Sequence, residues 1–446
     1  MSTYWNNHYL CSQNTQIAML LSFTVDNYRS FGKTMTLDLT ASNGIKDNPG
    51  IGITPISDTV KVLNAVAFYG ANSSGKSNFL RAIATMRRII VQSVRLNENE
   101  TLPYDPFVLT TATPRPTRFE AVLYHEKEKT TYKYGFEYNA EAITNEWLNS
   151  KAPRKSQKDL FSRTRDNFEI DEANFTQGIS IENKQLNKNR LLLSLAGQLG
   201  VNIANQIIAL FQKDMRILSG IEDANYSSYT RRLVHENEEY KVLAREFLRS
   251  MNLGFNEFET TKVEFEKLAF PPGLPAELIA EIKGRTIIEV SSFHRVYDSE
   301  DNPIGYKKLN LDENESAGTN KIFNLTGPIL EALKFGHVLL IDELDSQLHP
   351  LLSWRLIQLF NDPNRNHTGA QLLFSTHDTH LLSNRLFRRD QIWFLEKDPA
   401  ERSVLFPMTM ATEKLGHTPR NDSNYQKNYI NGLYGAIPFP INDSPR

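Results

Sequence analysis

The segment GANSSGKS, Gly70 to Ser77, matches the pattern GxxxxGK[ST] of a phosphate-binding loop. An apolar run, VLNAVAFYG, comes before it, and the residues SNFLRAIATMRRIIVQSV that follow keep apolar side chains near one face of a helix. In such a strand, loop and helix, backbone N–H groups converge on phosphate oxygens at the positive end of the helix. We therefore expect nucleotide phosphates to contact Gly70, Ala71, Asn72, Ser73, Ser74, Gly75, Lys76, Ser77 and Asn78.

Two side chains of this loop have the chemistry to act on the phosphates directly. Lys76 is expected to reach the β- and γ-phosphates, and the hydroxyl of Ser77 is expected to bind Mg²⁺. The structural alternative is a glycine turn with an exposed lysine. The strand before the loop and the helix after it favour the nucleotide-binding interpretation.

Two acids follow an apolar run in HVLLIDELDSQLHP, residues 337–350. The run predicts a buried parallel strand, and Asp342 at its carboxyl end can hold Mg²⁺ through water. Glu343 is placed to polarise an attacking water, because a carboxylate near a metal-bound γ-phosphate is the simplest base available. An apolar run followed by acids is a weak signal alone, but together with the phosphate-binding loop it is strong.

A third buried strand is predicted in QLLFSTHD, residues 371–378, and it ends at Thr376 and His377. It follows the acidic strand by one helix-sized interval, which predicts that the two strand ends lie side by side. His377 could then donate a hydrogen bond to the γ-phosphate and report its presence. A lone histidine at a strand end usually has no such role, so this hypothesis depends on the other two motifs.

The order of these motifs resembles the ABC-type ATPase heads, the group that includes Rad50, SMC and RecF. Those heads bind ATP and Mg²⁺, and a signature segment before the acidic strand contacts the γ-phosphate held by the partner subunit. Here the corresponding segment is ESAGTNKIFNLTGPILEAL, where Ser316 and Gly318 match the serine and second glycine of LSGGQ. Glu315, Ala317 and Thr319 depart from that pattern. The structural alternative is an ordinary helix cap by Ser316 with a glycine nearby.

Five segments together resemble the bacterial AAA-15/AAA-21 branch of that superfamily, and the resemblance covers most of residues 19–440. They are NYRSFG, GANSSGKS, ESAGT, DELDSQLHP and NYINGLYGAIP. By this resemblance Asp345 lies in a segment that crosses the dimer interface, and Arg29, Ser30 and Phe31 approach the nucleotide from the N-terminal strand. The glutamine that senses Mg²⁺ in ABC heads has no assigned counterpart.

The resemblance also implies what the protein works with. Many members of this branch belong to phage-defence and abortive-infection loci, paired with a nuclease or toxin gene. ATP would be sandwiched between two chains of a homo-oligomer, and a phage component would be the trigger. Only 69 residues follow His377, too few for an appended nuclease domain, so the effector is expected in trans.

Composition limits the other classes of function. The formal net charge of −2 provides no global basic field for nucleic acid or an anionic membrane. A single cysteine, Cys11, excludes an intramolecular disulfide and a cysteine-rich zinc site. No apolar run approaches the roughly 18 residues that a membrane-spanning helix needs, and no basic residue precedes the first apolar stretch, so we expect a cytoplasmic protein without a membrane anchor.

The expected fold class is α/β, a P-loop NTPase head of ABC type with a mixed central sheet, an added antiparallel meander and a mainly helical insertion. A polar leader precedes the first strand, and it is either a flexible arm or a segment that is not translated because the true start is Met19. The basic segment KAPRKSQK, residues 151–158, is interpreted as a solvated loop rather than a nucleic-acid patch. The expected parts are a leader (1–18), the N-terminal half of the head (19–149), the insertion (150–300), the C-terminal half of the head (301–410) and a tail (411–446).

Two functions remain open. The first is an ATP-driven sensor and scaffold of an anti-phage system that controls a nuclease or toxin. The second is a repair ATPase of the Rad50 and RecF kind that clamps duplex DNA. The near-neutral charge and the lack of a sustained heptad pattern for a coiled-coil arm favour the first.

Overall fold

The computed structural model describes residues 18–48, 50–165, 167–182, 186–218, 223–255, 257–263, 287–411 and 419–437. The leader predicted for residues 1–18 therefore lies outside the described residues, apart from Ala18. Two compact units make up the chain. Unit 1 contains residues 1–217, 332–345 and 356–446, and unit 2 contains residues 218–331 and 346–355. Ser316 therefore lies in unit 2 with the helices before it, while the acidic strand lies in unit 1.

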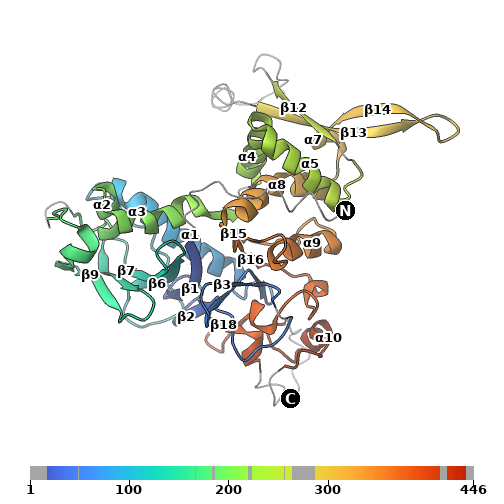
Figure 1. The fold of residues 1–446 in the computed structure, drawn as a ribbon. Helices are drawn as coiled ribbons and strands as arrows, with labels where there is room; N and C mark the ends of the chain where they lie inside the picture. Colours follow the sequence, from blue (N-terminus) through green and yellow to red (C-terminus); the bar gives the residue numbers. More distant parts are fainter. Residues whose placement is uncertain are drawn as a thin grey trace. The chain divides into compact units, whose positions relative to one another are not determined.

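A six-stranded sheet in unit 1 has the order β11-β15-β16-β5-β17-β18. Figure 1 labels β15, β16 and β18 of this sheet. Strands β15, β16, β5 and β17 run parallel, and β18 pairs antiparallel with β17. Every residue of β15, β16 and β5 is buried, as their continuous apolar runs predict for central parallel strands. The predicted mixed central sheet is confirmed. Its strands are β5 (Ala65–Tyr69), β11 (Met215–Leu218), β15 (Val338–Ile341), β16 (Gln371–Ser375), β17 (Ile392–Lys397) and β18 (Ser403–Pro407).

The second large sheet of unit 1 has seven antiparallel strands in the order β10-β9-β8-β7-β6-β1-β2. It confirms the added antiparallel sheet, but it extends to Ile170, beyond the predicted end at Asn149. The basic segment 151–158 is the mostly exposed connection between β8 and β9. The strands are β1 (Ala18–Asp26), β2 (Met35–Asp38), β6 (Thr117–His125), β7 (Thr130–Tyr138), β8 (Ile143–Lys151), β9 (Lys158–Thr164) and β10 (Phe168–Ile170).

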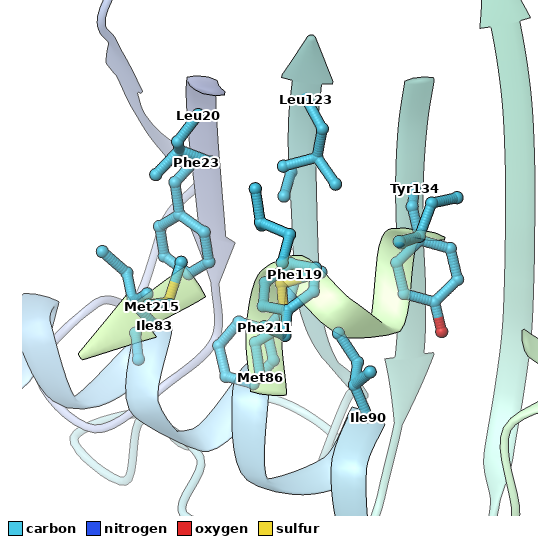
Figure 2. Packing of buried hydrophobic residues seen from close by; sticks show 14 of the residues in the cluster. Leu20, Phe23, Ile83, Met86, Ile90, Phe119, Leu123, Tyr134, Phe211 and Met215 are labelled. Atoms are coloured by element: carbon cyan, nitrogen blue, oxygen red, sulfur yellow. The ribbon is translucent and has the colours of Figure 1, made fainter. Parts of the chain in front are cut away.

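Helix α1 (Lys76–Gln92) lies between the two sheets. The ring of Phe79 is fully buried and contacts Phe68 of β5 and Phe23 of β1, with ring centroids 5.3 Å and 5.7 Å away. Further along the helix, Ile83 and Met86 pack against the antiparallel sheet (Figure 2). The apolar face predicted for this helix is therefore what fixes the end of the phosphate-binding loop against both sheets.

Shorter elements complete unit 1. Among its described residues no single helix is long and apolar enough to cross a membrane, and only the joined pair 192–198 and 202–214, bent by 110°, reaches that length and composition. The elements are β3 (Ile53–Pro55), β4 (Lys61–Leu63), α2 (Leu192–Gln198), α3 (Asn202–Ala209), α10 (Tyr425–Ile430), and the short helices η1 (Ser93–Arg95), η2 (Glu172–Thr176), η4 (Leu210–Asp214), η6 (Thr379–Leu381), η7 (Arg389–Gln391) and η8 (Met408–Met410).

Unit 2 combines helices with a three-stranded antiparallel sheet, β12-β13-β14, whose long β13–β14 hairpin is drawn in yellow in Figure 1. In the described part of the insertion, the longer helices lie within residues 192–251, where β11 interrupts them. The short helix η2 precedes that stretch, and strands lie on both sides of it. The elements are α4 (Asp223–Glu236), α5 (Glu238–Met251), β12 (Phe258–Val263), β13 (Ile287–Tyr297), β14 (Pro303–Asn310) and α7 (Leu311–Asn314); α8 (Ala317–Phe335) and α9 (Pro350–Asn361) each have residues in both units.

Candidate nucleotide-binding site

The loop between β5 and α1 requires glycine at both of its ends. Gly75, the residue before the helix, has a φ of 115°, which favours glycine. A Cβ atom at Gly75 would collide with the hydroxyl of Ser403, and one at Gly70 would collide with the carbonyl oxygen of Leu395. The strand, loop and helix predicted from the sequence are therefore present, with the loop held close to neighbouring backbone.

Lys76 lies at the centre of the loop. Its side chain is largely buried, and Nζ donates hydrogen bonds to the carbonyl oxygens of Gly70 at 2.8 Å and Ala71 at 3.1 Å. Burial lowers the pKa of this amine to about 8, although the charges of Asp342, Glu343 and Asp345 oppose that change. The amine predicted to reach the phosphates therefore lies within electrostatic reach of the three acids that follow β15.

Strand order brings the three motifs to one edge of the sheet. The acidic strand β15 pairs in parallel with β16, and β16 pairs in parallel with β5. The prediction that the acidic strand and the histidine strand are neighbours is confirmed. Ile341 pairs with Phe374, and Ser375 pairs with Phe68, so the carboxyl ends of the three strands are in register. The loop, the acids and His377 all follow from these ends, where ligands bind in open α/β sheets.

The turn after β15 carries the acids in a defined arrangement. Asp342 is half-buried, and its Oδ1 accepts a hydrogen bond of 2.5 Å from the hydroxyl of Ser375. Glu343 is exposed and has a φ of 53°, in the left-handed region, and its backbone N–H donates to the same hydroxyl at 2.8 Å. Asp345 accepts a hydrogen bond from the backbone N–H of His377 at 3.2 Å. The two strand ends are therefore joined by hydrogen bonds as well as by pairing.

His377 has an exposed ring beside this turn. Its pKa is lowered mainly by burial of part of the ring and next by the positive charge of Lys76, against the opposing effect of the three carboxylates. A lowered pKa keeps the imidazole neutral near pH 7, so one ring nitrogen donates while the other accepts. That is the form expected of a group that donates to a phosphate oxygen.

The predicted N-terminal contact, residues 29–31, divides into three different environments. The hydroxyl of Ser30 accepts a hydrogen bond from Asn78 Nδ2 at 3.0 Å, which places it at the first turn of α1. Arg29 pairs with Asp105 at 3.0 Å and has a φ of 49°. Phe31 is fully buried against Phe79, with ring centroids 5.8 Å apart, so its ring lies in the core and supports the turn instead of facing a ligand.

Ser316 and Gly318 lie in unit 2, at the start of α8. Ser316 is exposed, and its hydroxyl accepts a hydrogen bond from the backbone N–H of Thr319 at 3.1 Å, as a helix cap does. A Cβ atom at Gly318 would lie 2.6 Å from the carbonyl oxygen of Gln347. The capping interpretation therefore describes the local geometry, and the proposed role across a subunit interface is compatible with the exposure of Ser316.

Two serines that the sequence analysis did not select belong to this site. Ser375 bonds both Asp342 and Glu343, and Ser403 donates from its hydroxyl to the carbonyl oxygen of Ser74 at 2.6 Å. The backbone N–H of Ser403 also donates to the carbonyl oxygen of Ser30 at 2.7 Å. The only sequence signal for Ser375 is a polar residue at the end of an apolar strand. Ser403 has no such signal, because only the folding of the chain brings β18 next to the loop.

The oxygen donors of the site fit Mg²⁺. The hydroxyl of Ser77 and the carboxylate of Asp342 are hard ligands of the kind this ion prefers. Among the described residues no group of three or more His, Cys, Asp or Glu side chains could hold a metal ion without further ligands. Mg²⁺ commonly takes its remaining ligands from water and nucleotide phosphates. The arrangement therefore suits a metal that arrives with a nucleotide.

Solved structures that the chain resembles include SMC head domains and RecF. The SMC head bound to the C-terminal winged-helix domain of ScpA is 11% identical over 88% of this chain and 98% of that chain, with a TM-score of 0.48. The SMC head domain from Thermotoga maritima is 13% identical over 87% and 98%, with a TM-score of 0.38. RecF, the recombination mediator, in a form named RecF-ATPrS, is 12% identical over 88% and 100%, with a TM-score of 0.35. No curated protein matches the chain.

One family model matches the sequence itself. It is described as "AAA domain, putative AbiEii toxin, Type IV TA system" and matches residues 65–383, more than half of the chain. The match begins at β5 and ends after His377, so it contains the loop, the acids and the histidine strand in the order discussed above. The chain therefore belongs to the AAA_21 family, as the resemblance of its motifs to the AAA-15/AAA-21 branch predicts.

Proposed function

We propose that this protein binds and hydrolyses ATP. The observation that carries the proposal is the alignment of β15, β16 and β5, which brings Lys76, the two acids after β15 and His377 to one edge of the sheet. Lys76 would hold the β- and γ-phosphates, while Ser77 and Asp342 would hold Mg²⁺, which neutralises phosphate charge when bound. Glu343 would polarise the attacking water, and His377 would donate to the γ-phosphate.

We further propose that hydrolysis drives a switch in an anti-phage defence system of the cytoplasm. ATP would join two chains head to tail, with Ser316 and Gly318 of one chain against the phosphates held by the other. The protein would act as sensor and scaffold, and it would control a nuclease or toxin partner when a phage component is detected. The family description, which names a toxin and a type IV toxin–antitoxin system, supports this setting. The exposure of Ser316 is also what a contact between subunits requires.

Two substitutions test the proposed hydrolysis. Lys76→Ala removes the phosphate-binding amine and is expected to lose affinity for ATP. Glu343→Gln keeps the side-chain shape and is expected to bind ATP, hydrolyse it slowly and accumulate as an ATP-bound assembly. The measurements are ATP affinity, phosphate release and mass in solution. Unchanged ATP affinity in the alanine variant would contradict the loop assignment, and wild-type turnover by Glu343→Gln would mean that another group is the base.

The alternative function is a repair ATPase that clamps duplex DNA. The exposed connection between β8 and β9, which carries Lys151, Arg154, Lys155 and Lys158, is the observation in its favour. The two hypotheses separate when the chain is coexpressed with the products of its neighbouring genes. A stable complex with a nuclease or toxin supports the defence switch. A chain that dimerises only with ATP, and whose ATPase is stimulated by DNA and lost in high salt, supports the repair function.

A further inference from the structure

The turn that carries the two acids is held by one residue of the neighbouring strand. Ser375 is the last residue of β16 and is fully buried. Its hydroxyl donates to Oδ1 of Asp342 and accepts from the backbone N–H of Glu343, while its carbonyl oxygen accepts from the backbone N–H of Leu344 at 3.0 Å. Three consecutive residues of the turn are therefore bonded to a single serine.

This contact matters because the turn does not adopt an ordinary backbone conformation. Glu343 has a φ of 53°, which is unfavourable for a residue with a side chain and persists where surrounding bonds hold it. Leu344, the next residue, is fully buried and fixes the turn from the core. The backbone N–H of Glu343 is held by the hydroxyl of Ser375, so this hydroxyl supports the conformation from which the Glu343 side chain projects.

The same hydroxyl also determines which part of Asp342 is free to bind a cation. It has one proton, which it donates to Oδ1, and one of its lone pairs accepts from Glu343. A carboxylate oriented by such a bond presents its remaining lone pairs in a fixed direction. Residues that orient metal ligands in this way typically change metal affinity or activity about 10–100-fold when they are removed.

We propose that Ser375 is a positioning residue for hydrolysis, which orients the Asp342 carboxylate for Mg²⁺ and holds the backbone of Glu343 for its action as base. The proposal rests on the proposed ATPase function. Ser375 does not touch the nucleotide in this scheme, since it acts through the two acids. Ser375 also joins the histidine strand to the acidic strand. His377, two residues later, adds a second link, since its backbone N–H donates to Asp345.

The test compares Ser375→Ala, which removes the hydroxyl at nearly the same volume, with Ser375→Cys, whose larger side chain has only a weak S–H donor. Both variants are expected to lower kcat about 10-fold or more while the KM for ATP stays near the wild-type value. Mn²⁺, used as a spectroscopic probe for Mg²⁺, is expected to bind about 10-fold more weakly when Ser375→Ala is added to an ATP-loaded Glu343→Gln chain. Ser194→Ala is the matched control, because it removes a buried hydroxyl that donates to the carbonyl oxygen of Ile90 at 2.7 Å in another part of unit 1.

The outcomes separate this inference from the ATPase function. Absence of hydrolysis in the wild-type chain would contradict the proposed function itself. Hydrolysis by the wild type together with an unchanged kcat in Ser375→Cys, or an unchanged Mn²⁺ affinity in the double variant, would overturn the role of Ser375 alone. Equal losses in Ser194→Ala and Ser375→Ala would also overturn it, because they would indicate a general effect of losing a buried hydroxyl.

Discussion

Lys76 combines a side chain that carries charge with a buried position, and this combination suits a phosphate site. Its ammonium group is placed where burial disfavours charge, and its pKa is lowered to about 8 as a result. A bound phosphate would raise this pKa again, since its negative charge favours the protonated amine. At the scale of single residues, the protonated form of Lys76 is therefore less stable in the free site than in the site with phosphate bound.

This arrangement predicts a pH dependence of nucleotide binding. Below about pH 8 Lys76 is protonated and attracts phosphate, and above it the amine is neutral and that attraction is lost. Affinity for a non-hydrolysable ATP analogue is therefore expected to fall between pH 8 and pH 9.5, by at most about tenfold per pH unit, the limit for one proton. Titration calorimetry across this range measures it.

Lys76→Arg is the control for this titration, because a guanidinium stays charged over the whole range. Its affinity is expected to be lower than that of the wild type, owing to its different shape, but nearly independent of pH. The same decline in both proteins would show that another group causes it.

At the scale of elements, a buried carboxylate joins β8, β9 and α2. Glu146 is fully buried and pairs with Arg163 at 3.5 Å. Its oxygens also accept hydrogen bonds from the first backbone N–H groups of α2, Leu192 at 2.7 Å and Leu193 at 2.9 Å. Burial raises the pKa of Glu146, while the charge of Arg163 and these bonds oppose that rise. This carboxylate takes the place of a capping side chain, which α2 lacks at Leu191.

Glu146→Gln is expected to destabilise the protein strongly while leaving its shape intact. The change leaves the buried guanidinium of Arg163 without its counter-ion, a loss that typically costs about 3–5 kcal/mol. Urea unfolding of the two proteins measures the difference. Glu126→Gln removes an exposed pair with Lys129 and is expected to cost less than about 1 kcal/mol. A similar small value for Glu146→Gln would show that the buried pair is replaceable.

At the scale of the whole molecule, the residues that we propose contact ATP come from both units. The loop, the acids and His377 belong to unit 1, and Ser316 belongs to unit 2. A complete site in the proposed assembly takes the first group from one chain and Ser316 from another. The group of residues in unit 1 and Ser316 can then be inactivated by separate substitutions.

Mixing two inactive variants tests this sharing. Lys76→Ala and Ser316→Arg are each expected to be inactive, because every site in either protein lacks one component. In a mixed dimer both defects fall in the same site, and the second site combines an intact loop with an intact Ser316. Phosphate release is therefore expected to return on mixing. Continued inactivity of the mixture, with each variant folded, would contradict a site shared between chains.

The local motifs could be predicted from the sequence because their geometry is local. Gly70, Gly75 and Lys76 lie within one turn between a strand and a helix, and the apolar face of α1 follows from the spacing of its residues. The parallel strands were also predictable, since β5, β15 and β16 are continuous apolar runs. The neighbouring positions of β15 and β16 followed from the short helical interval between them.

Contacts between distant segments were decided only by the tertiary structure. Ser375 meets Asp342 across a separation of 33 residues, and Ser403 meets Ser74 across 329, and neither pairing leaves a pattern in the local sequence. The burial of Phe31 was missed because a short turn does not show which of its side chains faces the core. The unit to which Ser316 belongs is likewise decided by packing, because the sequence around Ser316 predicts only a helix start.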